Sequence, residues 1–208
     1  MKRLIMDSGH CYIEFDRTGF PLIRKKGWNY SISLFPISKY QFESFMIEKG
    51  PRGGLYTDDW YRELLKLNPR RSWKDCDTNP WELFLTGVKY KDLRYFFKFM
   101  GRDFRLPTPS EWKELHKASK EIKQIKANII KLCKEKAAPP VSHWIENDLF
   151  PLTDEGLFEI VIENNNVCCI GKPYYKLFSN LYNPTSVREV NWKVCKNMIG
   201  FRIVKSSK

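Results

Sequence analysis

Residues 101–116 read G-R-D-F-R-L-P-T-P-S-E-W-K-E-L-H, and this stretch predicts a short strand followed at once by a helix. Phe104 and Leu106 alternate with charged neighbours, which is typical of a half-buried strand. Pro107 then ends the strand, because the residue before a proline is held in an extended conformation. The strand is therefore expected to stop immediately before the helix begins.

The start of that helix has the residues of a capping box. Thr108 stands at the N-cap position, Pro109 at the first helical position, and Glu111 three residues after the cap. A threonine cap and a glutamate in this spacing satisfy two free backbone N–H groups reciprocally, and a proline in the first turn loses no hydrogen bond. Trp112 and Leu115 are the first apolar residues of the helix, so its buried side begins there.

The string R-L-P-T-x-x-E-W in this stretch is similar to the signature of the formylglycine-generating-enzyme-like (sulfatase-modifying factor) family. The positions that match are Arg105, Leu106, Pro107, Thr108, Glu111 and Trp112. Three other stretches resemble family segments in family order. They are an early helix at 36–45, a second helix at 88–100, and a closing strand at 200–204 that begins with Gly200, Phe201 and Arg202.

The resemblance covers most of the chain and implies an α+β fold similar to that of C-type lectins. Such a fold is irregular, with short antiparallel sheets, helices and many loops. We expect one domain over residues 1–208, with insertions at about 50–79 and 117–150. The residue patterns themselves predict strands at 11–15, 20–23 and 30–34, and helices at 38–48, 58–67 and 90–100, with Ser38 as a cap.

A regular apolar spacing continues far beyond the family signature. The apolar positions, three and four residues apart, are Leu115, Ala118, Ile122, Ile125, Ile129 and Leu132. They predict one long basic helix from Pro109 to about Lys136, roughly 40 Å in length. Its apolar side must be buried against the domain itself or against a partner, and the pattern leaves both open. Residues 141–155, which follow it, are expected to be irregular.

Little in the sequence indicates catalysis. The resemblance implies that catalytic family members hold copper with two cysteines, yet the corresponding segment 173–182 contains none. Cys168 and Cys169 are adjacent, so in a strand they point to opposite faces. The three histidines are scattered, whereas a metal site needs several ligands at suitable spacing. We therefore expect a scaffold without catalytic activity, metal or cofactor. A divergent metal-dependent oxidase is an alternative that would need Cys168, Cys169 or Cys195 to meet in the fold.

The net charge of +12 favours an acidic partner, either a protein or a nucleic acid. Two places could serve a nucleic acid, and their candidate residues are Arg70, Arg71, Lys117, Lys120 and Lys123. Near the two arginines, Trp73 could stack on a base. The interpretation we favour is a loop in which Trp73 packs into the core beside exposed arginines, because the basic residues form no sustained stripe there.

The family's substrate-facing surface lies in C-terminal loops, which suggests candidates for partner binding. They are Tyr174, Tyr175, Phe178, Tyr182, Arg188, Trp192 and Lys193. Tyrosine, tryptophan and arginine contribute most of the binding energy at protein interfaces. At least half of these residues are expected instead to be core residues, because the core of such a fold is small.

These observations favour a non-catalytic, protein-binding adaptor or accessory subunit. The resemblance implies a setting in bacterial multi-protein systems, regulatory or in antiviral defence, including CRISPR-associated ones. The alternative is a nucleic-acid-binding protein that uses the basic helix. Apolar runs are too short to span a bilayer, and residues 1–7 lack an apolar signal core, so no membrane partner and a cytoplasmic location are expected.

Overall fold

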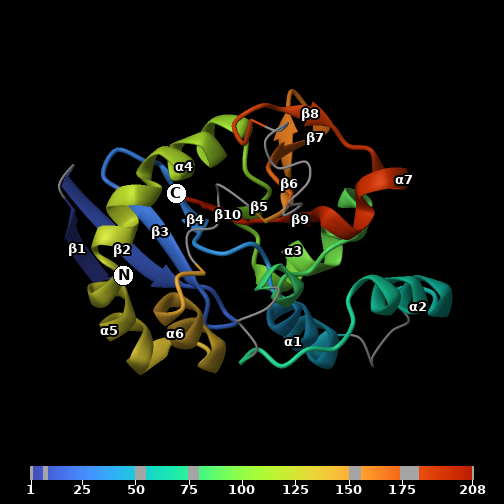
Figure 1. The fold of residues 1–208 in the computed structure, drawn as a ribbon, viewed down its shortest axis with the longest axis horizontal. Coiled ribbons are helices and arrows are strands. Elements are labelled where there is room, and N and C mark those ends of the chain that lie inside the picture. The colour runs from blue at the N-terminus through green and yellow to red at the C-terminus, as the bar shows by residue number, and fades with distance from the viewer. Residues whose placement is uncertain are drawn as a thin grey trace.

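Two small β-sheets and the helices around them form an α+β arrangement (Figure 1). The computed structural model describes residues 2–6, 9–49, 55–74, 80–149, 156–173 and 183–207. The α+β class expected from the sequence is therefore confirmed. None of the helices in these ranges is long and apolar enough to cross a membrane.

The first sheet is antiparallel throughout and consists mainly of N-terminal strands. In spatial order it contains β1 (Lys2–Met6), β2 (Gly9–Phe15), β3 (Pro21–Lys25), β4 (Tyr30–Ser33), β10 (Val204–Ser206) and β5 (Phe104–Arg105). The strands predicted at 11–15, 20–23 and 30–34 are confirmed as β2, β3 and β4, within two residues at each end. Between β2 and β3, Gly19 has a φ of 83°, a conformation that favours glycine.

The second sheet is mixed, which corrects the expectation of purely antiparallel sheets. Its spatial order is β8 (Arg188–Glu189), β7 (Asn166–Gly171), β6 (Phe158–Glu163) and β9 (Ile199–Phe201), and β6 runs parallel to β9. Strands β6 and β7 form a hairpin with a two-residue loop. Asn164 and Asn165 in this loop both have positive φ, at 49° and 65°, as a type I′ turn requires.

The closing strand predicted at 200–204 is wrong as a single strand. Residues 199–201 belong to the second sheet as β9, while 204–206 belong to the first as β10. Arg202 and Ile203 connect them, and the Arg202 guanidinium donates to the carbonyls of Ser33 and Leu34 at the end of β4. The chain therefore passes from one sheet to the other at Arg202.

Three helices lie in the lower right half of Figure 1. They are α1 (Lys39–Lys49), α2 (Asp58–Leu67) and α3 (Arg94–Met100), and α3 lies above α1 in Figure 1. The first two are confirmed, and the Ser38 hydroxyl accepts from the Gln41 N–H at the start of α1. The helix predicted at 90–100 differs at its start, because Tyr90–Asp92 forms a 3₁₀ turn and α3 begins only at Arg94. Near the C-terminus, α7 (Trp192–Cys195) is a single turn.

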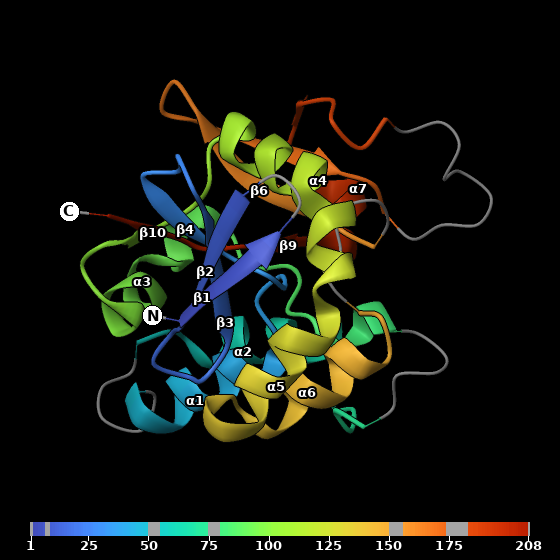
Figure 2. The same cartoon turned by 90° about the vertical axis from the view of Figure 1, so that its left-hand side faces the viewer.

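The single long helix predicted at 109–136 is wrong. The structure has α4 (Pro109–Gln124) and α5 (Lys126–Lys136), which meet at Ile125, and α6 (Pro139–Glu146) extends into the segment 141–155 that was expected to be irregular. The two prolines of α6 occupy its first turn, where they are tolerated. Helices α5 and α6 pack against each other (Figure 2).

The apolar side of these helices faces the domain's own core. Leu115, Ile122 and Ile129 are fully buried, and Ala118 and Ile125 are nearly so. A straight helix would carry the apolar residues of its second half beyond the domain. The change of direction at Ile125 instead keeps Ile129 and Cys133 in the cluster formed with β2, β3 and β4. Helix α4 also contacts both β1 and β6, so it lies against both sheets (Figure 1).

Replacing Ile129 tests whether α5 is integral to the domain. Because this side chain is fully buried, Ile129→Ala is expected to lower the free energy of unfolding by about 2–5 kcal/mol in a denaturant titration. The exposed Lys134 on the same helix provides the control, and Lys134→Ala should change stability by less than about 0.5 kcal/mol. Equal, small effects of both variants would mean that α5 does not pack on its own domain.

Candidate binding surfaces

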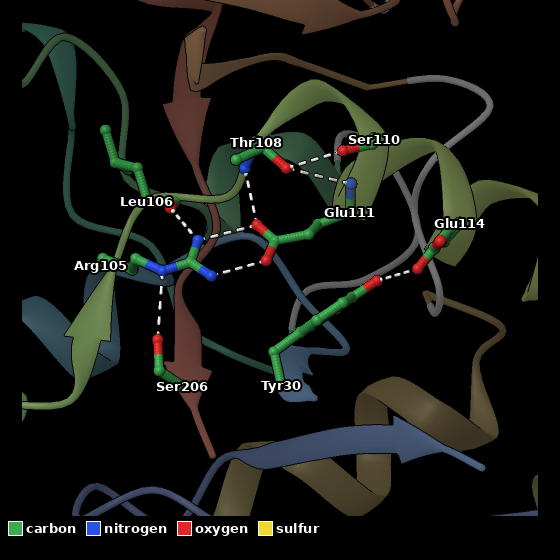
Figure 3. Close-up of polar contacts among 8 residues, drawn as sticks. All are labelled: Tyr30, Arg105, Leu106, Thr108, Ser110, Glu111, Glu114 and Ser206. Carbon is green, nitrogen blue, oxygen red and sulfur yellow. Dashed lines mark hydrogen bonds and ion pairs between the residues drawn. The ribbon is translucent and has the colours of Figure 1, made fainter. Parts of the chain in front are cut away.

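The capping box predicted at the start of α4 is confirmed and extended by an arginine (Figure 3). The Glu111 N–H donates to the Thr108 hydroxyl at 3.3 Å, and the Thr108 N–H donates to the Glu111 carboxylate at 2.8 Å. The same carboxylate accepts two bonds from the Arg105 guanidinium, at 2.6 and 2.8 Å. Burial by itself raises the pKa of Glu111, but the bonds from Arg105 and Thr108 hold that pKa below its ordinary value.

Arg105 also joins the helix start to the first sheet. Its Nε donates to the Ser206 hydroxyl of β10 at 3.2 Å, and its Nη1 to the Leu106 carbonyl (Figure 3). Close by, the Tyr30 hydroxyl donates to the Glu114 carboxylate, and burial followed by this bond raises the pKa of Tyr30. The signature residues thus have structural roles: they fix the first turn of α4 to the sheet.

The residues from Gly200 to Arg202, at the end of the stretch that resembles the family, also have structural roles. Arg202 and Glu159 are both buried and form an ion pair with Nε 2.8 Å from Oε2. A Cβ at Gly200 would lie 2.8 Å from the Leu157 side chain and 3.0 Å from the Leu85 carbonyl oxygen, so a larger residue would require Leu157 to move. Phe201 is fully buried in the cluster under α1 and α3. Trp112 is likewise fully buried, between Val161 and Ile170.

The lysines of α4 lie on the side of the helix opposite its buried side. We call four of them the lysine face: Lys113, Lys117, Lys120 and Lys123. At 100° per residue, these four positions lie within an arc of about 120° around the helix axis. The last three are exposed, and Lys113 is half-buried. Within the described part of the chain, none of the four has an ion-pair partner.

The loop at 69–74 matches the favoured interpretation with one correction. Trp73 packs against the core, its carbonyl accepts from the Trp144 Nε1 at 2.8 Å, and the Lys74 ammonium lies over its ring. It is therefore not a free platform for a base. Arg70 is exposed as expected, but Arg71 is largely covered, because it forms an ion pair with Glu82 at 2.7 Å.

The C-terminal candidates are only partly within the described residues. Tyr174, Tyr175, Phe178 and Tyr182 lie outside them. Arg188 donates to the Asn183 carbonyl at 3.1 Å and lies over the Phe158 ring. Trp192 packs against the core cluster under α1 and α3, whereas Lys193 is exposed. Arg188 and Trp192 thus make contacts within the domain.

The cysteines and histidines do not converge in the described residues. Cys169 is buried in one cluster and Cys168 packs against another, so the two thiols do lie on opposite faces of β7. The Cys195 side chain lies outside the described residues. His116 stacks on Trp112, and His143 contacts the Lys74 carbonyl at 3.2 Å. Across the described ranges, no three His, Cys, Asp or Glu side chains are grouped as a metal site would need.

A pocket between α1 and α2 was not predicted from the sequence. Its volume is about 430 Å³, and it is open to solvent on one side. Phe42 and Met46 of α1, Leu64 of α2, Trp73 and Trp144 are among the residues that line it. The amphipathic pattern of α2 shows that one side of this helix packs on something, but it does not show that the partner is α1.

Comparison with protein-family models, curated proteins and solved structures found no match to the chain. The family resemblance therefore stays a prediction, and the assignment of a function depends on the surfaces described above.

The pH dependence of stability tests the Arg105–Glu111 contact. A carboxylate whose folded pKa is lowered stabilises the fold above its unfolded pKa of about 4.3, and this stabilisation disappears as the pH falls through the folded value. Glu111→Gln should therefore cost about 1–2 kcal/mol at pH 7, a modest amount because Arg105 remains partly exposed. The difference from wild type should shrink below pH about 4. A difference independent of pH would contradict the charged contact.

Removing one partner of the buried ion pair should be costly. Arg202→Met leaves the Glu159 carboxylate buried without a cation, so the free energy of unfolding should fall by about 3–5 kcal/mol. The double variant Arg202→Met/Glu159→Leu should be more stable than Arg202→Met alone, because no unpaired charge remains. Thermal and denaturant unfolding of the two variants measures this. A double variant less stable than the single one would show that the carboxylate is satisfied without Arg202.

Proposed function

We propose that the chain is a non-catalytic binding protein, an adaptor or accessory subunit that docks on an acidic surface of another protein. The observation that carries this proposal is the lysine face of α4. Four lysines stand there without acidic partners in the described part of the chain, on one side of a helix whose other side is fully buried. The net charge of +12 also attracts an acidic partner before direct contact is made.

The rigidity of α4 supports a binding role for its lysines. Trp112, Leu115 and Ile122 are fully buried, and the capping box fixes the first turn. A partner that binds this helix therefore does not need to order its backbone, which lowers the entropic cost of association. Only the ends of the lysine side chains lose freedom.

The spacing of the lysines also has an energetic consequence. Lys113 and Lys117 are four residues apart, and Lys120 and Lys123 are three apart, so like charges face each other along the helix. Such pairs destabilise a helix by a few tenths of a kcal/mol each. The negative charges of an acidic partner would offset this repulsion between lysines. The resulting stabilisation of the helix would exist only in the complex.

We also propose that the fold belongs to the formylglycine-generating-enzyme-like, C-type-lectin-like type, as a single cytoplasmic domain. Support comes from the R-L-P-T-x-x-E-W string, whose capping box and arginine link the start of α4 to the first sheet. A setting in bacterial regulatory or defence complexes, including CRISPR-associated ones, has the resemblance as its only support.

Nucleic acid is the second candidate, and the same lysine face favours it. Lysines three or four residues apart are separated by about 4.5–6 Å along the helix axis, so the face offers a row of positive charges to a phosphate backbone. Trp73, which could have added stacking, is held against the core and by Lys74. A nucleic-acid complex would then depend on phosphate contacts, so its affinity would fall steeply with salt.

An affinity purification of the tagged full chain from its native cells separates the two candidates. We expect a protein partner to be retained after nuclease treatment at low salt and to be lost from a variant with glutamine at all four positions of the lysine face. The control replaces four exposed lysines elsewhere with glutamine, so that the net charge is equal. Its positions are Lys26, Lys89, Lys91 and Lys98.

The captured protein is then purified, and its affinity is measured by calorimetry. The lysine-face variant should bind about tenfold or more weakly than the control, because each exposed charge contact contributes roughly 0.2–1 kcal/mol. Equal affinities of the two variants would refute docking through α4. Loss of all bound material with nuclease would favour the nucleic-acid candidate instead.

A further inference from the structure

The pocket between α1 and α2 has a fixed apolar floor and one charged end. Phe42, Leu83, Leu85 and Trp144 line it and are themselves almost completely buried, so their positions are set by the core. Its volume of about 430 Å³ lies within the range of pockets that bind small molecules. A ligand would therefore enter a largely preformed site.

The charged end is formed by Lys39 at the start of α1 and by Arg70 and Arg71 after α2. Arg71 is paired with Glu82. The half-buried Lys39 ammonium donates to the Pro69 carbonyl at 2.8 Å and has no carboxylate within ion-pair distance among the described residues. An ammonium has three donors, so this group retains capacity for an anion.

The charged groups around this end have a net charge that one bound negative charge would neutralise. Besides the three cations, two carboxylates are present, Glu43 on the pocket wall and Glu82 beside Arg71. The balance is one positive charge. Burial, the largest effect, lowers the pKa of Lys39, and a bound carboxylate would oppose that effect by stabilising the ammonium.

We propose that this pocket binds a small amphipathic monoanion, with an apolar body along Phe42, Met46 and Leu64 and a carboxylate against Lys39. A small molecule fits better than a peptide segment, because the side-chain amide that lines the wall is already used. The Asn68 side chain bonds the backbone of Leu64 and both backbone groups of Thr86. A peptide would therefore leave backbone amides buried without partners.

Three probes with the same apolar body and different head groups test the assignment. They are decanoate, decanol and decyltrimethylammonium, each titrated below its micellar concentration into the full chain and followed by calorimetry. Decanoate should bind saturably with one site, decanol about tenfold more weakly or worse, and the cation least, since a hydrogen bond between charged groups is stronger than one to a hydroxyl.

Variants distinguish the head-group contact from simple adsorption to apolar surface. Lys39→Met should weaken decanoate binding about tenfold and remove the preference for decanoate over decanol. Lys98→Met, an exposed lysine that does not line this pocket, should leave both affinities unchanged. Leu64→Trp, which fills the space, should abolish binding of both probes, and its thermal unfolding shows whether the fold persists.

Several results would overturn the proposal: equal binding of all three probes, absence of saturable decanoate binding, or identical behaviour of Lys39→Met and Lys98→Met. Displacement of decanoate by the purified protein partner, with Lys39→Met weakening that partner as well, would also overturn it. That result would make the pocket part of a protein interface. The proposal is independent of the adaptor function, because the lysine face contributes no residue to this pocket.

Discussion

The ion pair between Arg202 and Glu159 determines how the two sheets are joined. Glu159 lies on β6 of the second sheet, while the guanidinium also donates to the Ser33 and Leu34 carbonyls at the end of β4 in the first. Both side chains are buried, and a buried charge is costly unless an opposite charge accompanies it. One arginine thus contacts both sheets at the point where the chain passes from β9 to β10, and a change in their separation would leave its charge or that of Glu159 unpaired.

The position of α4 depends on that arrangement of the sheets. The helix contacts β1 of one sheet and β6 of the other, and Arg105 ties its first turn to β10 beside the closing segment. The apolar residues of α4 are buried in these contacts. After the change of direction at Ile125, the apolar residues of α5 are buried in the same cluster. What α4 presents to solvent is then the lysine face. A surface of this kind follows from the core packing, because the buried side of the helix determines which residues must point outward.

Local patterns were predictable and long-range ones were not. The capping box, the bounds of α2, and strands β2 to β4 depend on neighbouring residues, so the sequence alone indicated them. The turn at Ile125 was missed because apolar residues spaced three and four apart fit a straight helix as well as two helices that follow a core. The pocket between α1 and α2 was missed for a related reason: helical periodicity identifies a buried side but not the element that covers it. Arg188 and Trp192 were candidates for partner binding, and the sequence did not indicate their contacts with Asn183, Phe158 and the core cluster, because these contacts are tertiary.

The two candidate surfaces differ in the physical force that each would use. The lysine face acts through charges in water, which are screened within about 8 Å at physiological ionic strength. The pocket acts through burial of apolar surface, which salt does not weaken. Raising the salt concentration should therefore release a partner from α4 while leaving a ligand's apolar body in the pocket, where Lys39 is half-buried and less screened. If both proposals hold, each surface would be occupied or emptied separately, and the chain would keep a small ligand while it gains or loses a macromolecular partner.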